Sequence, residues 1–205
     1  MSWTTVSGTT INSNADNRVI TGSGTANTLN GESTLTFGSD LLNISSTTQG
    51  LGLRLTNTAN EYTNIQFSAA RTSTDAALGI INAKWNNNHE VAAIYLTAGD
   101  DTSNKDDGKI RFYTSAASGN LALRLSIQND GKVTPGANGS QDLGSSSLRW
   151  ANVYTSDLDL SNEPKGGNDV DGTWGSYTIQ EGESDLFLIN KRNGKKYKFN
   201  LTEVS

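Results

Sequence analysis

Leu143 to Leu160 read LGSSSLRWANVYTSDLDL, and this stretch combines the two local patterns on which the predicted fold depends. Gly144 is a turn signal, and the serines at 145–147 are residues that commonly cap helix N-termini. The large side chains of Trp150, Val153 and Tyr154 follow at i, i+3 and i+4, which places them on one face of a helix. The first half is therefore predicted to form a single helical turn.

The second half of the stretch changes to a period of two. Leu158 and Leu160 alternate with Asp157 and Asp159, which predicts a half-buried strand. Because the flanking sequence is polar, we expect a neighbouring copy of the chain to cover the apolar side chains. The residues expected at this contact between copies are Leu148, Trp150, Val153, Tyr154, Leu158 and Leu160.

These residues resemble a line of the form LGSSSxRWxNxYxxxLxL that occurs in bacteriophage tail-fibre and virion-appendage proteins, above all in those of marine phages such as cyanophages. Gly108 to Gly136, GKIRFYTSAASGNLALRLSIQNDGKVTPG, is similar to the fibre pattern in which xIxFYT leads to RLxIxxDGxV. Asn14 to Ser45 resembles the lead-in of the same fibres. The resemblance implies an elongated, all-β homotrimer on a virion, and no catalytic residue lies within the motif.

The composition indicates a folded β protein with a thin core in each chain. Hydrophobic residues make up 34% of the 205 residues and charged residues only 18%, with 21 glycines and 2 prolines. Disordered chains usually combine low hydrophobicity with high charge, and this chain lacks the charge. We expect trimerisation to complete the core.

Charge and cysteine content exclude several classes of protein. The net charge of −5 argues against a nucleic-acid partner, because phosphate binding needs a basic surface. The absence of cysteine excludes disulfides and thiolate metal sites. No apolar run approaches the ~18 residues that span a bilayer, so no membrane insertion is expected. The first residues, MSWTTVSGTT, lack the features of a secretory signal.

Five segments are expected along the chain. Residues 1–30, rich in Ser, Thr, Asn and Gly, are expected to form an extended arm that attaches to other virion proteins. Residues 31–49 are predicted to form a β-hairpin, with its turn at Gly38-Ser39-Asp40. The remaining segments are a β-rich globular domain at 50–135, the trimer contact at 136–162 and a C-terminal β-hairpin sheet at 163–205.

The globular domain contains short apolar runs separated by polar turns. Strands are predicted at LGLRL (51–55), at Ile65 and Phe67, at 78–81, 91–96 and 110–113, and at LALRL (121–125). Strands at this spacing predict an antiparallel module that resembles a β-sandwich or a barrel.

The C-terminal sheet is predicted from strands at 177–180, 185–190 and 195–201. Asn193-Gly194 predicts a type I′ hairpin turn between the last two strands. In the last strand, Tyr197 and Phe199 should share one face, with Lys196 and Lys198 on the other.

Exposed aromatic and basic side chains are the candidate contacts to a host surface. Aromatic rings stack on sugars, and lysines attract anionic glycans. Two alternatives stay open: the aromatics pack in the core or between chains, and the lysines protect an edge strand from pairing with other chains. The candidates are Trp174, Tyr177, Lys196, Lys198 and Trp85.

No constellation for catalysis, cofactor binding or metal binding is expected. His89 has no second histidine or cysteine with which to share a metal. The carboxylates between Asp100 and Asp107 do not fit the EF-hand pattern and are read as a solvated turn, with a hard cation as the alternative. The self-cleaving domain that follows this motif in some fibres is not expected, because after Asp157 the sequence departs to LDLSNEPKGG.

The expected function is therefore that of a structural virion fibre or spike, a homotrimer that adheres to a host surface glycan or lipopolysaccharide without catalysis. One alternative is a short decoration of the capsid, neck or tail that binds no receptor. A second is a small polysaccharide depolymerase, which would need two carboxylates across a cleft.

Overall fold

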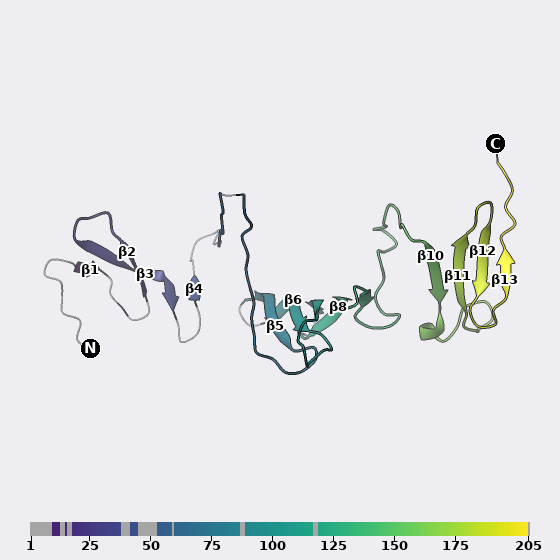
Figure 1. Ribbon diagram of the computed structural model, residues 1–205, viewed down its shortest axis with the longest axis horizontal. Coiled ribbons are helices and arrows are strands. Elements are labelled where there is room, and N and C mark those ends of the chain that lie inside the picture. Colours follow the sequence, from purple (N-terminus) through teal and green to yellow (C-terminus); the bar gives the residue numbers. More distant parts are fainter. Residues whose placement is uncertain are drawn as a thin grey trace. The chain divides into compact units, whose positions relative to one another are not determined.

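The computed structural model describes residues 10–12, 15, 18–37, 42–44, 53–58, 60–86, 89–116 and 119–204. Strands in this part of the chain form three sheets, and its only helical element is the short 3-10 helix η1 (Glu163–Lys165) (Figure 1). The prediction of an all-β protein is confirmed. The chain divides into two units, Met1–Ile65 and Gln66–Ser205.

The first unit contains a sheet built around β3 (Thr28–Phe37). This strand pairs in parallel with β1 (Thr10–Asn12) and antiparallel with β2 (Arg18–Gly22) and β4 (Leu42–Ile44). The β3–β4 pair is the hairpin predicted within 31–49, although its turn at 38–41 lies outside the described residues. Within the predicted extended arm, β1 and β2 instead pair with β3.

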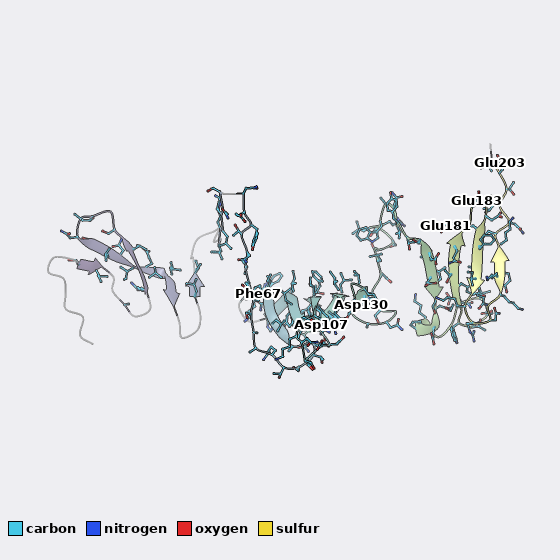
Figure 2. The ribbon with its side chains drawn as sticks, in the orientation of Figure 1. Phe67, Asp107, Asp130, Glu181, Glu183 and Glu203 are labelled. Carbon is cyan, nitrogen blue, oxygen red and sulfur yellow. The ribbon has the colours of Figure 1, made fainter. Side chains whose placement is uncertain are left out.

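Two strands were predicted in the stretch of chain between β4 and β5, and the described residues of this stretch do not form them. Residues 53–58 and 60–76 contain no strand, so the predictions at Leu53 and Leu55 and at Ile65 and Phe67 were wrong. Phe67, labelled in Figure 2, packs with its ring against Gly79, where an added Cβ would come within 2.4 Å of the ring. The Phe67 side chain thus packs on the face of a sheet, although its backbone is not part of a strand.

The second sheet, called the middle sheet below, is an antiparallel meander of five strands. In order these are β5 (Ala77–Trp85), β6 (His89–Ala98), β7 (Gly108–Ser115), β8 (Leu121–Ile127) and β9 (Val133–Pro135). They confirm the strands predicted at 78–81, 91–96, 110–113 and 121–125. They lie in a single sheet, so the sandwich-like module is not seen among the described residues, and residues 53–58 and 60–67 contain no strand that could supply a second layer.

The third sheet, called the C-terminal sheet, is an antiparallel meander of β10 (Asp157–Ser161), β11 (Ser176–Glu181), β12 (Leu186–Asn190) and β13 (Lys196–Lys198) (Figure 1). In Figure 2, Glu181 and Glu183 mark the turn between β11 and β12. The strand predicted at Asp157 to Leu160 is confirmed.

The last hairpin turn is not of type I′. Asn190 donates its N–H to the Lys195 carbonyl at 2.8 Å, which leaves a loop of residues 191–194 instead of a two-residue turn. Gly194 alone in this loop has a positive φ, of 73°, whereas a type I′ turn needs positive φ at both central residues. The Asn190 side chain accepts a hydrogen bond from the Arg192 N–H at 2.9 Å and thereby stabilises the longer loop.

Residues 136–156 link the two sheets without a strand or a helix, so the helical turn predicted at Trp150, Val153 and Tyr154 was wrong. The serine that was expected to cap a helix closes a tight turn instead. The Ser145 N–H donates to the Leu148 carbonyl at 2.8 Å, and the Leu148 N–H donates to Ser145 Oγ at 3.0 Å.

Candidate functional site

Two rows of apolar side chains cross the middle sheet on one face. Strand register aligns Ile81, Ile94, Phe112, Leu125 and Pro135 in the first row. It aligns Gly79, Leu96, Ile110, Ile127 and Val133 in the second. We call these two rows the apolar face of the middle sheet. It contains no charged side chain, and its edge residues are open, with Ile81 57% and Val133 62% exposed.

The opposite face of the middle sheet is polar and is closed by its own long side chains. The Tyr95 and Tyr113 rings lie 4.7 Å apart between centroids. Between these long side chains the small Ser126 and Thr97 are almost wholly buried, at 1% and 2% exposure. At the β5 edge this face also carries Ile80, the register partner of Tyr95, which is 41% exposed.

An ion cluster completes the polar face. Lys109, whose side chain is only 7% exposed, contacts Asp75 at 3.0 Å and Asp100 at 2.8 Å, and Arg111 contacts Asp75 at 2.6 Å. The hydrogen bond from Arg111 is the main cause that holds the pKa of Asp75 below its ordinary value. The hydrogen bond to Asp100, followed by that to Asp75, raises the pKa of Lys109. The two cations are thus neutralised within the chain.

The C-terminal sheet also has one apolar face. Strand register aligns Leu158, Ile179, Leu188 and Tyr197 in one row, and places Leu160 beside Tyr177 in the next. Leu158, Leu160 and Tyr197 are each exposed by about half, at 46%, 48% and 47%. We call these six residues the apolar face of the C-terminal sheet.

The residues predicted at the trimer contact divide into two groups. Leu158 and Leu160 lie on the apolar face of the C-terminal sheet. The others lie in the irregular segment before β10 and are strongly exposed, from 63% for Trp150 to 93% for Tyr154. One edge of the Trp150 ring lies about 3.5 Å from the position that a Cβ on Gly144 would take. The four residues before β10, which also include Leu148 and Val153, do not form one cluster with Leu158 and Leu160.

The candidate host contacts also differ in their surroundings. Trp85, at the end of β5, is 70% exposed. The Trp174 ring is covered by the Arg192 guanidinium, 4.0 Å from the ring centroid, and the Tyr177 hydroxyl accepts a hydrogen bond from Asn190 at 3.0 Å. Lys196 and Lys198 point to the face opposite Tyr197, as predicted, because their register partners are Ile189 and Phe187.

The acidic loop between β6 and β7 uses its carboxylates to hold its own backbone. Asp107, labelled in Figure 2, accepts hydrogen bonds from the N–H groups of Asp100 and Asp101 and from the Asn129 side chain. Asp101 accepts from the N–H groups of Ser103 and Asn104. Among the described residues, no group of three or more His, Asp or Glu side chains is placed to hold a metal ion. His89 pairs with Trp85 at the end of the β5–β6 hairpin.

No helix among the described residues is long and apolar enough to cross a membrane. Comparison with protein-family models, curated proteins and solved structures finds no match.

The apolar face of the middle sheet was not among the residues singled out from the sequence. The signal was nonetheless present in part, because Ile110 and Phe112 alternate with Lys109 and Arg111 in β7, and Leu125 and Ile127 flank Ser126 in β8. What the alternation could not reveal was how far these side chains stay exposed, and that the Phe67 ring packs on this face at Gly79.

Proposed function

We propose that the chain is a structural, non-enzymatic component of a virion, a homotrimeric fibre or spike protein that adheres to the host cell surface. The observation that carries the proposal is the apolar face of the middle sheet, which crosses five strands and remains exposed at Ile81, Leu125 and Val133, although the Phe67 ring covers it at Gly79. The three stretches that resemble phage fibres indicate the class of assembly.

The exposed apolar residues support self-assembly. Ile81 and Val133 on the middle sheet are 57% and 62% exposed, and Leu158, Leu160 and Tyr197 on the C-terminal sheet are 46% to 48% exposed. Contiguous apolar patches of this kind normally become buried in interfaces. A face without charge or hydrogen-bonding side chains offers little to a glycan or to nucleic acid, but it matches an identical apolar face.

The adhesive contact is proposed at Trp85, at the end of the β5–β6 hairpin. Its side chain projects at 70% exposure, and no cation from the described part of the chain covers it in the way that Arg192 covers Trp174. An exposed indole offers a flat apolar surface on which sugar rings stack. The partner would be a surface glycan or lipopolysaccharide.

An array of bacterial surface glycans and lipopolysaccharides, probed with the labelled trimer, tests the adhesive role. We expect binding to a subset of the array and a loss of at least tenfold in apparent affinity for Trp85→Ala, equivalent to about 1.4 kcal/mol. Tyr62→Ala is the matched control, because Tyr62 is another strongly exposed aromatic, at 81%. A trimer that labels virions but binds nothing on the array would instead be a decoration protein without a receptor. Release of products from the polysaccharides would support a depolymerase.

A further inference from the structure

The C-terminal sheet has two open edges of opposite charge. On its polar face, one cross-strand row reads Asp157, Gln180, Phe187 and Lys198, and the next reads Asp159, Thr178, Ile189 and Lys196. Each row begins with a carboxylate on β10 and ends with an ammonium group on β13. Figure 1 shows these two strands at opposite sides of the sheet.

The strand directions allow one copy of the sheet to continue into another. The four strands alternate in direction, so β10 and β13 run antiparallel to each other. A second copy in the same orientation would therefore present its β10 antiparallel to β13 of the first. The apolar faces of both copies would then lie on the same side and join into one surface.

The backbone groups on both edges are directed correctly for this pairing. Phe199 donates its N–H to the Leu186 carbonyl at 3.0 Å, and hydrogen-bonded positions alternate along an antiparallel strand. The N–H and C=O groups of Lys196 and Lys198 therefore face the open edge. On β10, the bond from Asn162 N–H to the Gly175 carbonyl fixes the same alternation, which directs the backbone groups of Asp157 and Asp159 outward.

We propose that β10 of one copy pairs with β13 of the next, with Leu158 opposite Tyr197, Asp157 opposite Lys198 and Asp159 opposite Lys196. A shift of two residues in either direction would keep only one of the two Asp–Lys pairs. The pairing joins different surfaces of identical chains, and such a head-to-tail contact closes into a ring when its rotation allows. The inference rests on the self-assembly proposed above and places both lysines between copies rather than at the host surface.

The contacts that these side chains make within one chain can be exchanged. Asp159 contacts Lys191 at 3.2 Å, and Lys198 contacts Asp185 at 2.7 Å. The side chains of both ion pairs are about one third exposed or more, and such solvated pairs contribute little to stability in water. Asp157 accepts a hydrogen bond from Gln180 at only one of its carboxylate oxygens. New partners from a second copy therefore compete with weak ones.

The middle sheet offers an internal contrast. It has an odd number of strands, so its edge strands β5 and β9 run in the same direction. β9 ends at Pro135, which has no N–H to donate to a further strand. The edge strands of the C-terminal sheet can therefore pair antiparallel with those of a second copy in the same orientation, whereas the edge strands of the middle sheet cannot.

Engineered disulfides test the pairing directly, because the native chain has no cysteine. In the proposed register, positions 158 and 197 of neighbouring copies form a non-hydrogen-bonded pair with Cα atoms about 4.5 Å apart, within disulfide range. Within one chain the same positions lie on strands at opposite edges, roughly 14 Å apart, and cannot be bridged. Oxidised L158C/Y197C should therefore run on denaturing gels as covalent trimers, and D159C/K196C should do the same.

Three controls make the result specific. The single variants L158C and Y197C should not cross-link, because cross-linking of either would show pairing of identical edges. L160C/Y197C, shifted by two residues, should not cross-link either. If this variant cross-links in place of L158C/Y197C, the proposed register is overturned.

Variants with altered charge distinguish the proposed pairing of β10 with β13 from the alternative that Lys196 and Lys198 keep the edge strand from pairing with other chains. K196E/K198E in the L158C/Y197C background should slow cross-linking, and D157K/D159K added to it should restore the rate. If lysines only repel other chains, K196S/K198S would speed cross-linking, which contradicts the proposal. The native mass must be measured first: a monomer refutes the proposed assembly itself, whereas a trimer without cross-links refutes only the edge pairing.

Discussion

Asp75 neutralises two cations on the polar face of the middle sheet. It contacts Lys109 at 3.0 Å and Arg111 at 2.6 Å. A lysine side chain that is only 7% exposed depends on such partners, because an uncompensated buried charge is costly. The carboxylate therefore allows two cations to lie on one face of the sheet without a partner from a second layer.

Asp75→Asn should lower the free energy of unfolding by roughly 0.5 to 1 kcal/mol at pH 7, a small loss because Asp75 is 45% exposed and its ion pairs are screened. The pKa of Asp75 is lowered in the folded protein from its ordinary 3.8. Its stabilising contribution is thus complete at neutral pH and is lost as the pH falls below about 4 and through the folded pKa. Denaturant unfolding at pH 7 and pH 3, at one protein concentration, measures the difference.

Asp106→Asn is the matched control, because Asp106 is an exposed carboxylate in the neighbouring loop. The gap between the two variants should be present at pH 7 and should narrow at pH 3. Equal unfolding free energies at neutral pH would show that the Asp75 cluster does not stabilise the sheet.

At the scale of elements, each sheet in the second unit is a single layer with one apolar and one polar face. Phe112 and Tyr113 are neighbours in β7 that point to opposite faces of the middle sheet. Phe112 belongs to the apolar face, whereas the Tyr113 ring packs on Tyr95 within the same chain. Substitutions of these two residues therefore distinguish effects on association between chains from effects on the stability of the single chain.

Phe112→Ser should weaken the trimer by about 3 to 5 kcal/mol per chain, as for the truncation of large aromatic side chains in cores, because its ring would lie between chains. The variant should dissociate at low micromolar concentration in sedimentation velocity. Tyr113→Ser should lower the melting temperature while the sedimenting species keeps its mass. If both variants sediment as the native protein does, the apolar face is not an interface.

Most strands could be predicted from the sequence, because alternation in β6, β7, β8 and β10 encodes a face directly. The errors have physical causes. Trp150, Val153 and Tyr154 have helical spacing, but the segment is too short and too polar to nucleate a helix without packing. Phe67 has the apolar character of a strand residue but packs on a sheet through its ring.

The candidate surfaces were only partly accessible from the sequence. The alternation of Tyr197 with Lys196 and Lys198 was predicted, but the row partners of the lysines depend on register across four strands. The same holds for the rows that cross the middle sheet. A single sequence provides the period of a strand, whereas the register comes from turns such as that at 191–194, which was misassigned.

At the scale of the whole molecule, the account requires identical chains to supply the layer that one chain lacks. Leu158, Leu160 and Tyr197 on the C-terminal sheet and Ile81 and Val133 on the middle sheet are each at least 46% exposed. The net charge of −5 is modest, so repulsion between copies does not oppose contact between uncharged faces. Stability should therefore depend on protein concentration, as it does for any assembly in which folding and association are linked.

The mass of the native protein in solution tests this central claim most directly. Light scattering coupled to size-exclusion chromatography should give three times the chain mass of 21.8 kDa, unchanged over a tenfold dilution. A monodisperse species at the mass of a single chain would contradict the account, because both apolar faces would then be stable in water without a partner.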